Sequence, residues 1–82
     1  MSAFRFAVEI MPREGILDPA GRAVETALPP LHADTVHEVR VGRRVELTVQ
    51  ADSAEAARDQ VDSLAADFLA NPLIERWEIS AL

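Results

Sequence analysis

Hydrophobic and polar residues alternate in four stretches of the chain, in the period-two pattern of strands that bury one face of a sheet. The clearest stretch covers 4–11, where apolar side chains hold the even positions. The other three cover 36–41, 44–50 and 73–79. Because Gly42-Arg43 is a short connection that contains glycine, we expect it to join the second and third strands as a tight hairpin.

Two further stretches place apolar residues three and four positions apart, as amphipathic helices do. The first helix should begin at Asp18-Pro19, because aspartate accepts free backbone N–H groups there and proline fits the first turn. Pro29-Pro30 should end it. The second should begin at Asp52-Ser53 and end at Asn71-Pro72. The two apolar stripes would comprise Ala20, Ala23, Val24, Ala27, Leu28 and Leu31, and then Ala54, Ala57, Val61, Leu64, Ala65 and Phe68.

The resulting order is strand, helix, strand, strand, helix, strand, which is the βαββαβ order of ferredoxin-like domains. We therefore predict an α+β, two-layer fold in which two helices cover one face of a four-stranded antiparallel sheet. Eighty-two residues allow one small domain, so the prediction assigns the whole of 1–82 to a single unit.

The second face of this sheet has no part of the chain left to cover it. It would carry charges of both signs, contributed by Arg5, Glu9, Glu38, Arg40, Glu46, Arg76 and Glu78. Antiparallel sheets tolerate water on one face, so the face is either solvated or in contact with another copy of the chain. Because the chain is also small, we predict a homo-oligomer and leave dimer and tetramer open.

Composition excludes several classes of function. The net charge is −6 and all eight basic residues are arginine, so a nucleic-acid footprint of clustered cations is not expected. No apolar run reaches the length of a membrane span, and the charged residues Arg5 and Glu9 interrupt any signal-peptide pattern. We therefore expect a cytoplasmic protein without a membrane partner.

No set of residues forms a complete active site. The chain lacks cysteine, which excludes a thiol nucleophile and thiolate metal sites, and it lacks lysine and a glycine-rich phosphate loop. His32 and His37 are the only imidazoles, and we expect them to be surface residues without a third metal ligand. Acylphosphatases share the element order and length, but the loop 12–17 has one glycine and the strand 44–50 has no asparagine. No catalytic, cofactor-binding or metal-binding residue is therefore predicted.

Three blocks, in matching order and spacing over nearly the whole chain, resemble one family. They are REGILDPAG at 13–21, VRVGRRVEL at 39–47 and LANPLIE at 69–75. Together they resemble PurS, the small subunit of phosphoribosylformylglycinamidine synthase in purine biosynthesis. This chain departs from the usual family pattern by having Arg13 and Arg43 in place of lysines and Trp77 in place of a frequent tyrosine. The pair Pro29-Pro30 also replaces a glycine-containing loop.

The resemblance implies a noncatalytic accessory subunit. In the family's complex, a PurQ-type glutaminase releases ammonia from glutamine, and a PurL-type synthetase uses ATP and Mg to activate formylglycinamide ribonucleotide (FGAR) for conversion to the amidine (FGAM). A PurS-like chain would bridge these two partners, assist ammonia transfer and bind none of the cofactors alone. The alternative is a free-standing ferredoxin-like module that binds a small molecule.

The candidate interface residues are Arg40, Gly42, Arg43, Arg44, Glu46, Asn71 and Pro72. The three arginines form the only local cationic cluster, which is either a solvated hairpin tip or a docking point for an acidic patch or phosphate on a partner. Gly42 is predicted to allow a turn or a close backbone approach. Asn71-Pro72 is first a helix stop and only secondarily an interface element.

Overall fold

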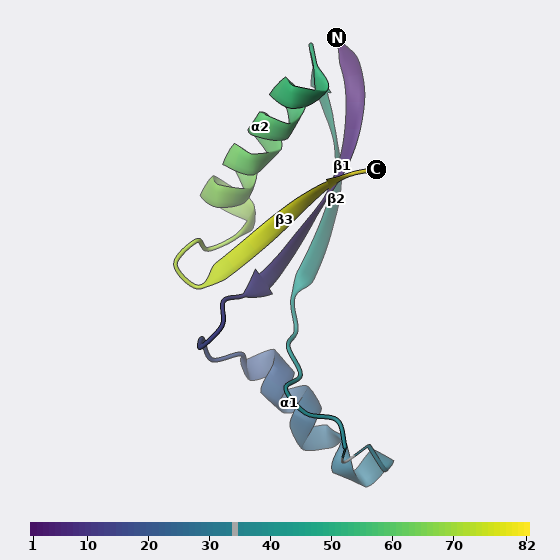
Figure 1. Ribbon diagram of the computed structural model, residues 1–82, viewed down its shortest axis with the longest axis vertical. Coiled ribbons are helices and arrows are strands. Elements are labelled where there is room, and N and C mark those ends of the chain that lie inside the picture. Colours follow the sequence, from purple (N-terminus) through teal and green to yellow (C-terminus); the bar gives the residue numbers. More distant parts are fainter. Residues whose placement is uncertain (34) are drawn as a thin grey trace.

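The computed structural model describes residues 1–33 and 35–82 (Figure 1). The elements are, in order, β1 (Ser2–Pro12), α1 (Pro19–Ala27), β2 (Arg43–Ala51), α2 (Ala54–Leu64) and β3 (Glu75–Ala81). A 3-10 turn at Pro29–Leu31 follows α1, and a π-helical turn at Ala65–Leu69 extends α2. The predicted α+β class is confirmed.

The sheet has three strands in the order β2-β1-β3, and both pairs are antiparallel. In the central strand, Phe6 lies opposite Leu47 of β2 and Ala81 of β3. The alternation predicted for the first strand is confirmed, because Phe6, Val8 and Ile10 are all buried beneath α2. β1 therefore supplies the centre of the hydrophobic core.

Helix α2 begins as its sequence predicts, but its predicted stripe is buried only in part, because Ala54 and Leu64 are exposed. The Ser53 side chain accepts a hydrogen bond from the Ala56 N–H at 3.1 Å, as an N-cap does. Ala57, Val61 and Ala65 of the predicted stripe are fully buried. Phe68 is instead 79% exposed. The π-helical turn, closed by the Ala70 N–H and the Ala65 carbonyl, adds a residue to the last turn and so rotates this ring off the stripe.

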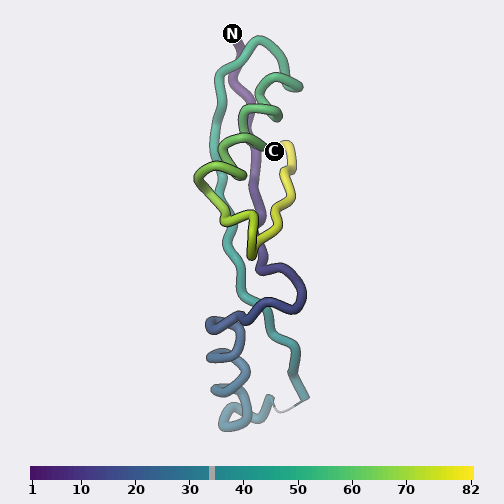
Figure 2. The backbone as a smooth tube through the Cα atoms, turned by 90° about the vertical axis from the view of Figure 1, so that its left-hand side faces the viewer, coloured from purple at the N-terminus to yellow at the C-terminus, as the bar shows by residue number. Residues whose placement is uncertain are grey.

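The predicted four-stranded sheet is wrong. Residues 36–42 form neither strand nor helix, and the chain runs from them directly into β2 without the hairpin expected at Gly42-Arg43 (Figures 1 and 2). Glu38 has a left-handed backbone with φ of 57°, which interrupts any strand at this point. The Val41 N–H is also taken by the Asp18 carboxylate instead of a neighbouring strand. The sheet consequently stops at three strands.

The expectation that two helices cover one sheet face is also wrong. Helix α2 packs on all three strands, whereas α1 makes no comparable contact with any strand. With residues 36–42, α1 projects beyond the end of the sheet as an arm, which we define as residues 13–33 and 35–42 (Figures 1 and 2). The molecule measures 53 × 25 × 14 Å, and its radius of gyration is 16.3 Å. A compact chain of this length would have a radius of about 12 Å.

The last strand begins two residues later than predicted. The alternation in 73–79 predicts that Leu73, Trp77 and Ile79 point inward. Trp77 and Ile79 do face the core, but Leu73 lies before the strand and is exposed. The Asn71 carbonyl accepts hydrogen bonds from the N–H groups of Ile74 and Glu75, and this turn delays the start of β3.

Candidate functional site

The three arginines predicted to form one cationic cluster lie in three different places. Arg43 and Arg44 are neighbours in β2, so their side chains point to opposite faces of the sheet. Arg43 lies on the face that α2 covers, Arg44 on the open face, and Arg40 in the arm. Each pairs with an acid of this chain, at 2.7 Å for Arg43, 2.8 Å for Arg44 and 3.8 Å for Arg40. The three arginines therefore form no shared cationic patch, and their role in docking stays a prediction.

Arg43 closes one end of the core. Its guanidinium donates two hydrogen bonds to the Glu75 carboxylate, at 2.7 and 3.1 Å, and another to the Leu69 carbonyl at 2.5 Å. The same carboxylate accepts the Asn71 N–H at 2.8 Å. Two predicted residues, Arg43 and Asn71, are thus brought together through Glu75, which sequence reasoning missed. A fork of two parallel N–H donors is available to arginine and not to lysine.

Asn71 and Pro72 shape the turn between α2 and β3. The Asn71 side-chain oxygen accepts the Leu73 N–H at 3.1 Å. The Pro72 carbonyl accepts a hydrogen bond from Arg13 Nε at 2.9 Å. The helical chain ends at Leu69, so the predicted helix stop lies two residues beyond the actual end. Both residues therefore stabilise this turn through hydrogen bonds, and their role at an interface stays a prediction.

The Asp18 carboxylate connects α1 to the second segment of the arm, residues 35–42. Its carboxylate accepts the Gly21 N–H at 3.0 Å, as predicted for an N-cap, and also the Val41 N–H at 2.8 Å. A Cβ atom on Gly21 would collide with this carboxylate and with the Val39 carbonyl, so the close approach of α1 to the returning chain requires glycine. Arg40 braces the same region by donating to the carbonyls of residues 13 and 16.

The two bonded carboxyls have lowered pKa values. The pKa of Glu75 lies below its ordinary 4.5, first because Arg43 donates to it and second because the Asn71 N–H does. The pKa of Asp18 lies below its ordinary 3.8, first because of the Val41 N–H and second because of the Gly21 N–H. Both residues therefore favour the folded state most when they are ionised.

The lowered pKa values of Asp18 and Glu75 predict that the folded protein loses stability in acid. A carboxyl whose pKa is lowered by folding adds stability above its unfolded pKa, and that stability is lost as the pH falls through the folded value. We expect the thermal midpoint to fall as the pH drops below about 4.5. In the Glu75→Gln variant, the midpoint should start lower at neutral pH and fall less over the same interval. Equal slopes for the two proteins would contradict the assignment to Glu75.

The face of the sheet that α2 does not cover, the open face, carries a network of ion pairs. Arg44 contacts Glu9 at 2.8 Å and Glu46 at 3.0 Å, and Arg5 lies 3.6 Å from Glu46. Ala7, in the centre of this face, has no exposed surface. Glu46, a predicted interface residue, is therefore placed on the charged face, as the alternation of β2 predicts.

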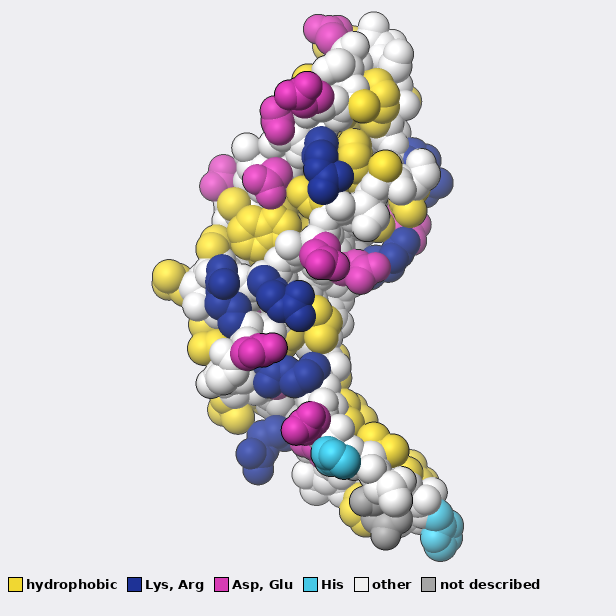
Figure 3. Space-filling model, in the orientation of Figure 1, with side chains coloured by type: hydrophobic (Ala, Val, Ile, Leu, Met, Phe, Trp, Pro, Cys, Tyr) yellow, Lys and Arg dark blue, Asp and Glu magenta, His cyan; other side chains and the backbone are white. Residues whose placement is uncertain are grey.

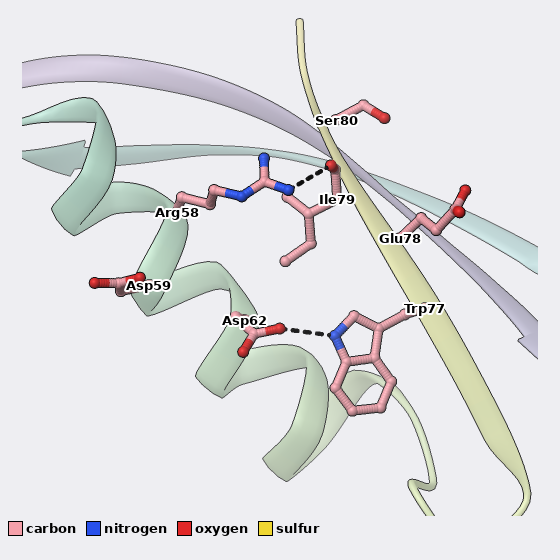
Figure 4. A pocket seen from close by; sticks show the side chains of 7 residues that line it. All are labelled: Arg58, Asp59, Asp62, Trp77, Glu78, Ile79 and Ser80. Atoms are coloured by element: carbon pink, nitrogen blue, oxygen red, sulfur yellow. Dashed lines mark hydrogen bonds between the residues drawn. The ribbon is translucent and has the colours of Figure 1, made fainter.

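The described residues form at least two surface grooves. One, of about 510 Å³, runs between α2 and the free edge of β3 (Figure 4). There Arg58 donates to the Ile79 carbonyl and Trp77 Nε1 donates to Asp62, both at 3.0 Å. The second, of about 780 Å³, lies at the elbow, which we define as residues 12–13 and 42–43, where the arm joins the sheet. Arg22, Arg40, Arg76, Glu14, Glu25 and Glu38 are among its lining residues. Such mixed charge selects no single ion.

Among the residues that line the two grooves, Ser80 is the one hydroxyl, and no hydrogen bond joins it to a neighbouring carboxylate (Figure 4). In the described ranges 1–33 and 35–82, histidine, aspartate and glutamate form no group of three that could hold a metal ion. Among the same residues, no helix has the length and apolar character needed to span a membrane.

Comparison with known proteins identifies relatives over the whole chain. The family model PurS, described as phosphoribosylformylglycinamidine (FGAM) synthase, matches residues 5–82. A PurS subunit from Synechocystis is 43% identical over 72 residues, which cover 85% of this chain and 72% of that protein. A PurS subunit from Thermotoga maritima is 30% identical over 82 residues and covers both chains completely.

Solved structures agree in fold. A chain in the structure of PurLQS from Thermotoga maritima superposes with a TM-score of 0.89 at 30% identity, and the match covers all of both chains. PurS from Bacillus subtilis gives a TM-score of 0.85 at 30% identity, covering 96% of this chain and 98% of that one. The resemblance carried by the three sequence blocks is confirmed, and this chain belongs to the PurS family of phosphoribosylformylglycinamidine synthase subunits.

Proposed function

We propose that this chain is the noncatalytic subunit that bridges a PurQ-type glutaminase and a PurL-type synthetase during the conversion of FGAR to FGAM. The observation that carries the proposal is its full-length match to the chain of that family in the PurLQS structure. The sequence has no cysteine to release ammonia from glutamine and no phosphate-binding loop for ATP. Glutamine, ATP and Mg would therefore be held by the partners, and the site of action would be the cytoplasm.

A bridging role has a physical advantage for ammonia transfer. Neutral ammonia is the nucleophile, and it protonates readily in water near neutral pH. A subunit that seals the junction between the glutaminase and the synthetase would keep the nucleophile neutral on its path.

Reconstitution tests the proposal. The synthetase and glutaminase should form FGAM from glutamine only when this chain is added, whereas the synthetase supplied with ammonium salt should need neither of the other two subunits. The three proteins should also copurify when glutamine and nucleotide are present. Full glutamine-dependent activity without this chain would contradict the proposal.

We also propose that the working unit contains more than one copy of the chain. The arm exposes large apolar side chains that a lone protomer leaves in water (Figure 3, yellow). Leu17, Leu31 and Val36 are among the exposed apolar residues of the arm. Burying them is favourable by about 25 cal/mol per Å² of apolar surface removed from water.

Substitution of an exposed arm residue tests this association. Leu31→Ser should shift the protein toward the 9.0 kDa monomer in sedimentation at micromolar concentration. Leu73→Ser is the matched control, since Leu73 is at least as exposed but lies outside the arm, and it should leave the sedimentation coefficient unchanged. A wild-type protein that sediments as a monomer would refute self-association.

A further inference from the structure

Strand β3 pairs with β1 on one side and has a free edge on the other. Among the described residues the strand order is β2-β1-β3, so no strand lies beyond β3. The Leu82 N–H donates to the Arg5 carbonyl at 2.9 Å, which places the even-numbered residues of this segment in the row that bonds to β1. Backbone groups alternate in direction along an antiparallel pair. Those of Trp77, Ile79 and Ala81 therefore point away from β1.

Arg58 shows that these outward groups accept a donor from outside the sheet. Its guanidinium projects from α2 and donates to the Ile79 carbonyl at 3.0 Å (Figure 4). A charged side chain at a free edge is a common protection against unwanted strand pairing. Here the protection covers one carbonyl, whereas Trp77 and Ala81 have no strand partner among the described residues. The edge is therefore guarded only in part, and strand addition remains open to it.

The groove beside this edge has room for the side chains of an added strand. It lies between α2 and β3 and has a volume of about 510 Å³ (Figure 4). Trp77 and Ile79 line it from β3 and are only half-buried. Residues directly paired across two strands share one face of the sheet. Every second side chain of an added strand would thus enter the groove and cover these two apolar residues.

The groove is acidic. It is lined by one arginine and three carboxylates, which are Arg58, Asp59, Asp62 and Glu78, and they leave two negative charges. None of the three carboxylates forms an ion pair within the described part of the chain. Asp62 points from α2 toward Trp77 and accepts its indole N–H at 3.0 Å (Figure 4). A long basic side chain fits both features, because its methylene stem covers apolar surface while its charged end reaches a carboxylate.

We propose that the free edge of β3 receives an extended segment of a partner subunit that carries lysine or arginine at every second position. The segment adds an outer strand antiparallel to β3, bonds to its outward backbone groups, and places basic side chains over Trp77 and beside Asp62. This inference rests on the bridging function, which supplies the partner subunits. It adds the surface of the chain that one of them contacts and the chemistry of that contact.

A second copy of this chain fits the edge less well than a basic segment does. Two copies paired through β3 about a two-fold axis perpendicular to the sheet would place both α2 helices on the same side. Asp59 and Asp62 of one copy would then approach the same residues of the other, and like charges brought together in an interface repel. The net charge of −6 on each chain adds to this repulsion. A basic segment has the complementary charge.

Trp77 reports directly on the groove, since it is the only tryptophan of the chain. The probe is the synthetic peptide KTKTKTK with blocked ends. It should shift the fluorescence of Trp77 in a saturable way when titrated to about 1 mM, the weak end of specific recognition. The peptides ETETETE and QTQTQTQ, of equal length and alternation, should not. The absence of a saturable response to KTKTKTK, or an equal response to QTQTQTQ, would overturn the proposal.

Methylation of the peptide backbone separates strand addition from attraction by charge alone. In an antiparallel added strand, the residues whose side chains enter the groove also direct their N–H groups at β3. KTKTKTK methylated on the lysine amide nitrogens should therefore lose binding. Methylation of the threonine amide nitrogens, which point away from β3, should preserve it. Binding that survives methylation at lysine would overturn the antiparallel strand proposed here.

The double variant Asp59→Asn/Asp62→Asn tests the charge complementarity. Asparagine at position 62 keeps an oxygen that can accept the indole N–H, so the fold should be retained. The affinity for KTKTKTK should fall by about 3–10-fold. Glu14→Gln/Asp52→Asn is the matched control, because it removes two charges at exposed positions outside the groove, and it should change the affinity by less than about twofold. Equal losses in the two double variants would overturn the assignment to this groove.

The same variants test the edge in the reconstituted complex. Asp59→Asn/Asp62→Asn should require about 3–10-fold more of this chain for half-maximal glutamine-dependent activity, and the matched control should behave as the wild type does. An unchanged requirement in the groove variant would overturn the edge as a docking surface. Wild-type chain that binds KTKTKTK at Trp77 but restores no glutamine-dependent activity would instead refute the bridging function and leave the strand site in place.

Discussion

The Gly42→Val variant should be less stable than the wild type by about 1–3 kcal/mol, the usual cost of forcing a side chain into filled space. The new Cβ atom would collide with the Ile10 carbonyl oxygen, which belongs to the backbone of the central strand and cannot rotate away. Either β1 and β2 must separate near the elbow or the arm must change direction. Urea denaturation followed by Trp77 fluorescence should show a lower midpoint.

Thr48→Val provides the control for Gly42→Val. Thr48 is an exposed residue of β2, and valine has nearly the same shape as threonine. The free energy of unfolding should therefore change by less than about 0.5 kcal/mol. Wild-type stability in the Gly42→Val protein would mean that the elbow has room for a side chain. In that case the close contact between residue 42 and β1 would not fix the direction of the arm.

Elements whose signals are local were predicted well. The Ser53 cap and the spacing of Ala57, Val61 and Ala65 lie within one short segment, and the structure places them as expected. The alternation of β1 likewise identifies its buried face, because the side-chain direction of a strand reverses at every residue. Such patterns depend on neighbours in sequence and need no knowledge of distant contacts.

The strand predicted at 36–41 shows what such patterns leave out. Alternation reports that a segment is suited to one buried face, but it does not say which strand, or which copy of the chain, lies beside it. In the described chain this segment bonds to Asp18, which lies 23 residues from Val41 in sequence. The same holds for the pair formed by Arg43 and Glu75, which are 32 residues apart. Neither contact has a local signature.

The prediction that Arg40, Arg43 and Arg44 form one cluster is wrong, and the sequence itself already contained the reason. Consecutive residues in a strand point to opposite faces, so Arg43 and Arg44 could not share a patch once 44–50 was assigned as a strand that begins at the next residue. In the structure, Arg43 contacts Glu75 and Leu69 on the core side, and Arg44 contacts Glu9 and Glu46 on the open side. Proximity in sequence was mistaken for proximity on the surface.

Replacing Asp18 with alanine should unfold the arm while leaving the sheet and α2 folded. The carboxylate is the acceptor for the Gly21 and Val41 N–H groups, and its loss leaves the buried Gly21 donor and the part-buried Val41 donor without this partner. Helix α1 has nine residues, too few for a stable helix in water without tertiary contacts. The core beneath α2 contains no residue of the arm, so it should persist.

Hydrogen exchange locates the effect of Asp18→Ala on the chain. Amides of α1 should lose their protection, those of β1 and α2 should keep it, and Trp77, which is bonded to Asp62 in the body of the molecule, should keep its fluorescence. Thr26→Ala, an exposed change within α1, should leave protection near the wild-type level. If α1 amides stayed protected in Asp18→Ala, the carboxylate would not be what holds the arm together. Since both self-association and bridging require an ordered arm, the same variant should fail to restore glutamine-dependent activity to the other two subunits.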